Sequence, residues 1–126
     1  MITIPENLLY TRSNEWAESL DALIRTGIDD YSQSSLGDIV HIEIFPEGSR
    51  VMAGKTFGTI EATKSVSEIH SPVSGVILHV NPEILESPGL VNIDPYGEGW
   101  LAEISPDNPE ELDSLMTPSA YKSFIS

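Results

Sequence analysis

The sequence contains no cysteine among its 126 residues. Disulfide bonds, thiolate metal sites and a thiol nucleophile are therefore excluded. Basic residues are also scarce, with six lysines and arginines against twenty aspartates and glutamates, and the net charge is −14. Nucleic acid and anionic membranes would repel such a chain, so neither is expected as a partner. The acidity can serve solubility alone, for example in a salty habitat, or it can match a partner with a basic docking face.

Long apolar runs are missing as well. None approaches the roughly 18 residues that a membrane span requires. The amino-terminal stretch MITIPENLLY lacks the basic and then apolar pattern of a secretory signal. The chain is therefore expected to be soluble and cytoplasmic. With 40% apolar residues, it is expected to bury a core within a single domain that spans residues 1–126.

Turn residues are frequent and the apolar runs are short, which is typical of an all-β domain. The candidate strands are Leu8–Tyr10, Ala22–Ile28, Ile39–Ile44, Thr56–Ala62, Ser65–Ile69, Val76–Val80 and Trp100–Ile104. In two of them apolar and polar residues alternate, so one face should point into the core. This predicts the inward-facing residues Val40, Ile42, Ile44, Val76, Leu78 and Val80.

Short helices are predicted at the edges of these strands. Asp29 can cap a helix over Asp30–Leu36, with Gly37 in the position of a left-handed terminator. A cap residue followed by proline at the first helical position occurs twice more. It predicts a carboxy-terminal helical segment of about residues 108–125, with helices over Glu110–Leu115 and Ser119–Phe124.

A faint internal repeat is visible between residues 37–42 and 75–80, whose glycine, apolar and histidine positions match at one constant offset. Such a match can arise by chance between any two strands that follow a glycine. Alternatively, it reflects two similar halves around a pseudo-twofold axis. In that case Lys64 lies on the connection between the halves.

Lys64 is one of only three lysines and lies within GTIEATKSVSEIHSPVSG, residues 58–75, where two predicted strands meet at a turn. A lysine in a turn is ordinarily just an exposed side chain. However, Thr63 and Ser65 are small and polar, so they leave the amine open to an acylating enzyme. A stem extended by an octanoyl chain would form an arm of roughly 12–14 Å, from about ten bonds of ~1.5 Å in zigzag. A biotin carrier would show methionine on both sides of the lysine, and neither neighbour is methionine.

The stretch Phe57–Glu68 with Ser71-Pro72-Val73-Ser74-Gly75 closely resembles the lipoyl-attachment hairpin of the H protein of the glycine cleavage system. The resemblance spans nearly the whole chain and is also carried by Tyr10, Glu15-Trp16, residues 27–31, 36–40 and 90–100, Glu111-Leu112 and Ala120-Tyr121. It implies a mainly β fold, a lipoyl-domain-like barrel-sandwich hybrid of two antiparallel sheets with short peripheral and C-terminal helices.

The resemblance also implies a carrier protein and not an enzyme. Lipoate would be attached covalently to Lys64 by a lipoate ligase or a lipoyl/octanoyl transferase, with Glu61, Thr63 and Ser65 around the attachment point. The arm would accept an aminomethyl group from a pyridoxal-phosphate glycine decarboxylase and present it to a folate-dependent aminomethyltransferase. A flavin-dependent dihydrolipoyl dehydrogenase would then reoxidise the dithiol, since the hard chemistry belongs to the arm and the partner enzymes.

Ser13 and Glu15 fall on family positions that line a cleft for the loaded arm, and Glu68 follows Lys64 by four residues, where aspartate is often found. The aminomethyl cargo is a protonated amine, so a carboxylate is its expected partner. The alternative is that these carboxylates are simply solvated at the surface.

Several residues depart from the family pattern. Asn14 replaces the histidine of a common His-Glu-Trp, Ser35 replaces a histidine of the first helix, and His70 replaces an aromatic residue before Ser-Pro. A second class therefore stays open, an H-like lipoate-binding protein of bacterial sulfur oxidation that serves a heterodisulfide-reductase-like complex. The three histidines show no short ligand spacing, so no metal site is expected.

Overall fold

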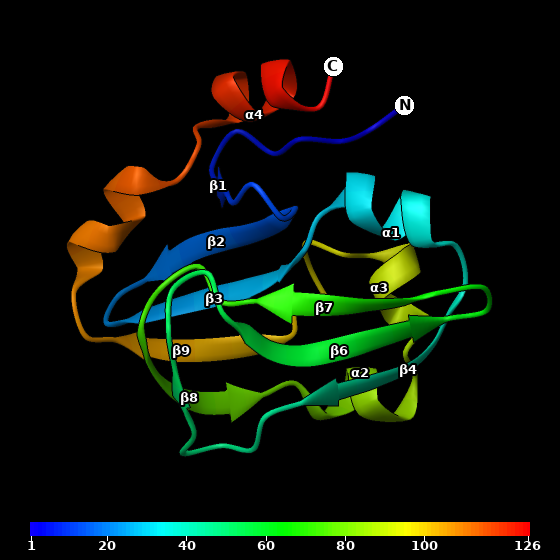
Figure 1. Ribbon diagram of the computed structural model, residues 1–126, viewed down its shortest axis with the longest axis horizontal. Helices are drawn as coiled ribbons and strands as arrows, with labels where there is room; N and C mark the ends of the chain where they lie inside the picture. The colour runs from blue at the N-terminus through cyan, green and yellow to red at the C-terminus, as the bar shows by residue number, and fades with distance from the viewer.

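The computed structural model describes residues 1–126, which form two antiparallel sheets with short helices at their edges (Figure 1). The strands of the larger sheet lie in the order β1 (Leu9–Tyr10), β2 (Glu15–Leu20), β3 (Leu23–Ile28), β9 (Ala102–Pro106), β8 (Gly75–Val80) and β5 (Arg50–Val51). The smaller sheet has the order β4 (Ile39–Ile44), β6 (Thr56–Ala62) and β7 (Val66–His70). The expected mainly β fold of two antiparallel sheets is confirmed.

The helices are all short. They are α1 (Asp30–Leu36), α2 (Pro82–Glu86), α3 (Leu90–Ile93), the 3-10 helix η1 (Pro109–Ser114) and α4 (Pro118–Phe124). The predicted cap of α1 at Asp29 is confirmed, because its side chain accepts a hydrogen bond from the Ser32 N–H. The helix ends at Gly37 with a positive φ of 80°, but its ψ of −154° lies outside the left-handed helical region that was predicted there. None of these helices has the length and apolar character needed to cross a membrane.

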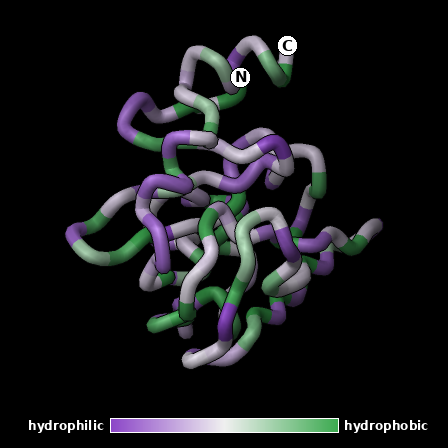
Figure 2. The backbone as a smooth tube through the Cα atoms, turned by 60° about the vertical axis from the view of Figure 1, so that its left-hand side comes forward, coloured by the Kyte–Doolittle hydropathy of each residue, from purple (hydrophilic) through white to green (hydrophobic).

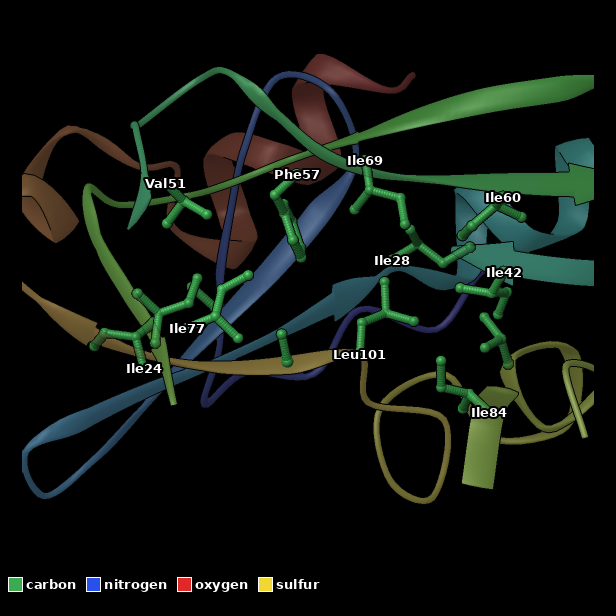
Figure 3. Packing of buried hydrophobic residues seen from close by; sticks show 14 of the residues in the cluster. Ile24, Ile28, Ile42, Val51, Phe57, Ile60, Ile69, Ile77, Ile84 and Leu101 are labelled. Carbon is green, nitrogen blue, oxygen red and sulfur yellow. The ribbon is translucent and has the colours of Figure 1, made fainter. Parts of the chain in front are cut away.

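The hydrophobic core lies between the two sheets. Side chains from both sheets point into one interior in Figure 3, with Phe57, Ile60 and Ile69 from the smaller sheet and Ile24 and Ile77 from the larger one. A second cluster of buried residues, Leu8, Tyr10, Trp16 and Tyr121, joins both ends of the chain. There the rings of Tyr10 and Tyr121 stack with their centroids 4.6 Å apart. Figures 1 and 2 show the two termini side by side as a result.

Two β-bulges change which residues face the core. The pairing register shifts between Ile39 and His41 in β4 and between Ile77 and His79 in β8. A bulge puts an extra residue into one strand and interrupts the alternation of its side chains. The inward prediction was therefore wrong for Val40 and Leu78, which are 54% and 41% exposed.

The positions of these bulges bear on the internal repeat. Ile39 and Ile77, which precede the exposed Val40 and Leu78, are both buried. Each bulge thus occupies the same place in the aligned segments 37–42 and 75–80. A shared irregularity of the backbone favours two similar halves over a chance match.

Most predicted elements exist, with small shifts at their ends. The strands over Ile39–Ile44 and Thr56–Ala62 and the helix over Asp30–Leu36 are confirmed as predicted. The other predicted strands begin or end one or two residues away, and the predicted helix over Glu110–Leu115 is the 3-10 helix η1. The strands β2 and β5 and the helices α2 and α3 were not predicted.

Candidate functional site

Lys64 lies at the tip of the hairpin formed by β6 and β7, which projects at the right of Figure 1. The Ala62 N–H donates to the Ser65 carbonyl at 2.8 Å and closes the turn. The Lys64 side chain is exposed and makes no hydrogen bond or ion pair. Its flanking residues, Thr63 and Ser65, are also exposed. By contrast, the guanidinium groups of Arg25 and Arg50 pair with Glu103 and Asp107. The Lys64 amine is therefore free to react.

The backbone of the same tip is anchored. The Thr63 N–H donates to the carbonyl of Asp38 at 3.0 Å, just before β4 begins. The side chain of Asn92 in turn supports that segment, because it accepts from the Ile39 N–H at 3.0 Å and donates to the Gly37 carbonyl at 2.9 Å. The hairpin thus presents a free side chain on a fixed base.

Glu61 and Glu68 are both exposed on the hairpin. Glu68 lies four residues beyond Lys64, and β7 begins only at Val66, so the two Cα atoms are at most about 13 Å apart at ~3.3 Å per residue. This distance matches the arm of roughly 12–14 Å that the sequence led us to expect. An arm folded back along β7 would therefore end near the Glu68 carboxylate.

Glu15 lies deeper, with a side chain that is only 1% exposed. One carboxylate oxygen, Oε1, accepts hydrogen bonds from the hydroxyls of Thr11 and Ser13, the latter at 2.6 Å. The other, Oε2, accepts from the backbone N–H of His70 at 3.0 Å and lies 3.1 Å from Nδ1 of its ring. The alternative of a solvated surface carboxylate is thus wrong for Glu15, although it describes Glu68.

His70 connects the two carboxylates. Its Nδ1 faces Glu15, and its Nε2 lies 3.8 Å from Oε1 of Glu68. In the sequence, His70 was notable only as a departure from the family pattern, and Thr11 was not among the predicted site residues. The only signal for Thr11 in the sequence was a hydroxyl residue four positions before Glu15.

A depression of about 360 Å³ adjoins this network. Among the residues that line it are the two hydroxyl partners of Glu15, together with Ser71 and the apolar side chains of Leu115 and Met116. The structure therefore brings Ser13, Glu15 and Glu68 close to one another through His70. Glu61, Thr63, Lys64 and Ser65 lie apart from them at the hairpin tip.

The loop before Glu15 is held by Asn14, whose φ of 70° is in the left-handed region that asparagine tolerates. Its carbonyl accepts from the Asp29 N–H at 3.1 Å, and its side-chain oxygen accepts from the Tyr121 hydroxyl at 3.1 Å. Burial raises the pKa of Asp29 from its ordinary value of 3.8 to about 6. Asn14 therefore links the Glu15 loop to the start of α1 and to α4.

The other histidines are paired separately. His41 lies 3.2 Å from Glu43, and His79 lies 2.8 Å from Glu103 on the larger sheet. Histidine, aspartate and glutamate side chains do not gather anywhere in groups of three or more that could hold a metal ion.

Comparison with known proteins gives consistent results. Residues 8–126 match the family described as glycine cleavage H-protein. The glycine cleavage system H protein of Anaeromyxobacter sp. (strain K) is 44% identical over 122 residues, which cover 97% of this chain and 95% of the relative. That of Carboxydothermus hydrogenoformans is 42% identical over 125 residues, covering 99% and 96%. The crystal structure of a glycine cleavage system H protein from Mycobacterium marinum superposes with a TM-score of 0.89 at 34% identity, covering 95% of this chain and 97% of that one.

Proposed function

The chain belongs to the glycine cleavage H-protein family, and from this premise we propose that Lys64 is the residue on which it carries lipoate. The protein is a lipoyl carrier of the glycine cleavage system and not an enzyme. The observation that carries the assignment to Lys64 is its exposed, unpaired amine on the anchored tip of the β6–β7 hairpin. When bound, lipoate would supply a dithiol that carries the cargo between active sites.

The residues near Lys64 fit such a group. Thr63 and Ser65 are small and exposed, so an acylating enzyme can approach, and Glu61 completes the attachment region. We propose that Ser13, Glu15 and Glu68 form the cleft toward which the loaded arm folds back. The proposed lipoyl-carrier domain spans residues 1–126, and its cytoplasmic location remains a prediction from the sequence.

The partners of the chain are those of the glycine cleavage system. We propose four individual partner enzymes. A lipoate ligase or lipoyl/octanoyl transferase loads Lys64, and a pyridoxal-phosphate glycine decarboxylase delivers the aminomethyl cargo. A folate-dependent aminomethyltransferase removes it, and a dihydrolipoyl dehydrogenase reoxidises the arm. The alternative, a sulfur carrier that serves a heterodisulfide-reductase-like complex, has no support from the relatives.

Intact mass tests the attachment site. After expression with lipoate and a ligase, we expect the protein mass to rise by one lipoyl group and the Lys64→Arg variant to remain unmodified. Arginine is the suitable replacement because it keeps the positive charge but is not acylated by the same chemistry. Lys55→Arg and Lys122→Arg are matched controls at the other two lysines and should be modified like the wild type. A modified Lys64→Arg variant would disprove the assignment.

Loading tests the cargo. With lipoate confirmed on Lys64, incubation with glycine and a glycine decarboxylase should add an aminomethyl group to the arm. A lipoylated protein that cannot be loaded would contradict the role in glycine cleavage while leaving the attachment site intact.

A further inference from the structure

The Lys64 turn is held from outside the hairpin by one short segment, residues 37–39. Apart from the bond that closes the turn, residues 63–65 hydrogen-bond only to the carbonyl of Asp38, through the Thr63 N–H at 3.0 Å and the Thr63 hydroxyl at 3.4 Å. The strand β4, which follows this segment, is an edge strand, so no other strand supports it on its outer side. The position of Lys64 therefore depends on what holds residues 37–39.

Asn92 in α3 holds this segment with both ends of its side-chain amide. Its Oδ1 accepts from the Ile39 N–H at 3.0 Å, and its Nδ2 donates to the Gly37 carbonyl at 2.9 Å. A backbone N–H only donates and a carbonyl only accepts, so the two contacts permit a single orientation of the amide. The second hydrogen of Nδ2 is directed to Oε1 of Gln33 at 3.1 Å. No other side chain of this size offers one acceptor and two donors in this way.

Gln33 connects Asn92 to the start of α1. Its Nε2 donates to Oδ1 of Asp30 at 2.7 Å, which leaves its Oε1 to accept from Asn92. The other oxygen of Asp30, Oδ2, accepts from the Thr3 N–H at 2.7 Å. Each donor in this series faces an acceptor, so the amide orientations of Gln33 and Asn92 support each other. A continuous set of hydrogen bonds thus joins the first turn of α1 to the base of the Lys64 hairpin.

Acylation of Lys64 requires its amine at a defined place. A lipoate ligase uses ATP to form an acyl adenylate of lipoate, and the deprotonated amine attacks the acyl carbon. An amide bond forms, the bond to the phosphate oxygen breaks, AMP leaves and one proton is released to water. The reacting atoms have to meet at about 3–3.5 Å. A hairpin tip that is already fixed loses less conformational freedom when the enzyme binds it than a loose tip does.

We propose that Asn92 is a positioning residue for the acylation of Lys64. Through residues 37–39 it holds the hairpin tip in the position in which the ligase binds it. The inference rests on the proposed function, in which Lys64 carries lipoate, and assigns a part of the protein outside the hairpin that makes this lysine a good substrate.

The rate of lipoylation tests the role of Asn92. With a lipoate ligase, lipoate and ATP, we expect kcat/KM for the Asn92→Ala protein to be about tenfold lower than for the wild type. The loss should arise mainly from a higher KM, because the loosened tip must be ordered on binding. Acetylation of Lys64 by the small reagent N-hydroxysuccinimide acetate, measured by mass spectrometry, should keep the wild-type rate. This reagent needs no docking, and the amine is exposed in either protein.

Asn81→Ala is the matched control. Asn81 also uses both ends of its amide, because it accepts from the Glu83 N–H and donates to the carbonyls of Glu98 and Trp100. These partners belong to α2 and to the loop before β9, and not to residues 37–39. The control variant should lose stability but be lipoylated at the wild-type rate.

Gln33→Ala covers the case in which Asn92→Ala fails to fold. Gln33 is only half-buried on α1, alanine favours a helix, and the variant removes just one of the three contacts of Asn92. We expect kcat/KM for lipoylation to fall about threefold, in keeping with the loss of one hydrogen bond that supports the amide. Ser34→Ala, at an exposed position on the same helix, should leave the rate unchanged.

The outcomes separate this inference from the function on which it rests. Wild-type kcat/KM in both Asn92→Ala and Gln33→Ala would overturn the inference alone and leave Lys64 as the attachment site. An equal loss in Asn81→Ala would also overturn it, since general destabilisation would then account for the effect. A wild-type protein that the ligase does not modify at Lys64 would overturn the proposed function and this inference together.

Discussion

Asp29 is a residue at which folding and ionisation oppose each other. Its Oδ1 accepts from the Ser32 N–H at 2.9 Å and caps α1, while its Oδ2 is buried without a hydrogen-bond partner. Burial disfavours the charged form and raises the pKa of this carboxyl to about 6. The folded protein thus holds the proton more tightly than the unfolded chain does.

We expect Asp29 to reduce the stability of the protein as the pH rises from about 4 to about 6, with no further change above that pH. The loss should be roughly 2–3 kcal/mol, at about 1.4 kcal/mol for each pKa unit. Asp29→Asn stays neutral and keeps the capping oxygen. Urea unfolding should therefore show that the free energy of unfolding of Asp29→Asn, relative to that of the wild type, rises by this amount between pH 4 and pH 7. A pH-independent difference would mean that the carboxylate has a compensating partner.

Lys64 should contribute almost nothing to stability. Its side chain is exposed and makes no polar contact, so Lys64→Ala should change the free energy of unfolding by less than about 0.5 kcal/mol. Thermal unfolding of the unlipoylated protein measures this directly. A large drop in melting temperature would reveal a structural partner of the lysine.

At the level of elements, the position of the hairpin depends on Asn92 in α3. Asn92→Ala removes the partners of the Ile39 N–H and the Gly37 carbonyl, on the segment that anchors Thr63. We expect a loss of roughly 1–3 kcal/mol, the cost of leaving partly buried polar groups unpaired. Hydrogen exchange at the Thr63 amide should also accelerate, because its acceptor on Asp38 becomes less fixed.

Asn108→Ala is the matched control for this experiment. Asn108 caps η1 by accepting from the Glu110 N–H at 3.0 Å. Its loss should cost about 1 kcal/mol without changing exchange at Thr63. Equal exchange at Thr63 in both variants would show that α3 does not hold the hairpin.

Elements with strong local signals could be predicted from the sequence. The cap at Asp29, the alternation in residues 39–44 and the glycine after α1 are all local features, and the corresponding elements were found. The strand β2 was missed because EWAESL contains charged and small residues, although Glu15, Trp16 and Ala17 are buried by tertiary contacts. The helices α2 and α3 have only five and four residues, too few to show a helical period.

For the proposed site, the sequence predicted which residues form it but not how deep they lie. The hairpin and the exposed position of Lys64 at its tip could be predicted because the pattern around this lysine is local in the sequence. The burial of Glu15 depends on Thr11 and on His70, which is 55 residues away. No local pattern reports a contact across such a separation, so the pairing with His70 required the structure.

The whole molecule is strongly self-repelling, with a net charge of −14. This net charge already includes the two arginines that form ion pairs, Arg25 with Glu103 and Arg50 with Asp107, so the excess of carboxylates has no partner among the basic residues. Salt should therefore stabilise the fold by screening repulsion more than it weakens these pairs.

We expect the melting temperature to rise by roughly 3–5 °C between about 10 mM and about 500 mM sodium chloride, equivalent to about 1 kcal/mol. Calorimetry at neutral pH measures the shift, and potassium chloride should give a similar result if screening is the cause. A melting temperature that falls with salt would mean that the ion pairs outweigh the repulsion.

The two chain ends lie side by side, joined by the stacked rings of Tyr10 and Tyr121 (Figures 1 and 2). For protein engineering, this makes the ends a convenient handle. A tag, a bead or a fused enzyme attached there would leave the β6–β7 hairpin uncovered. A short peptide could also join the ends into a ring, so that new ends could be opened in an exposed turn while the carrier function is kept.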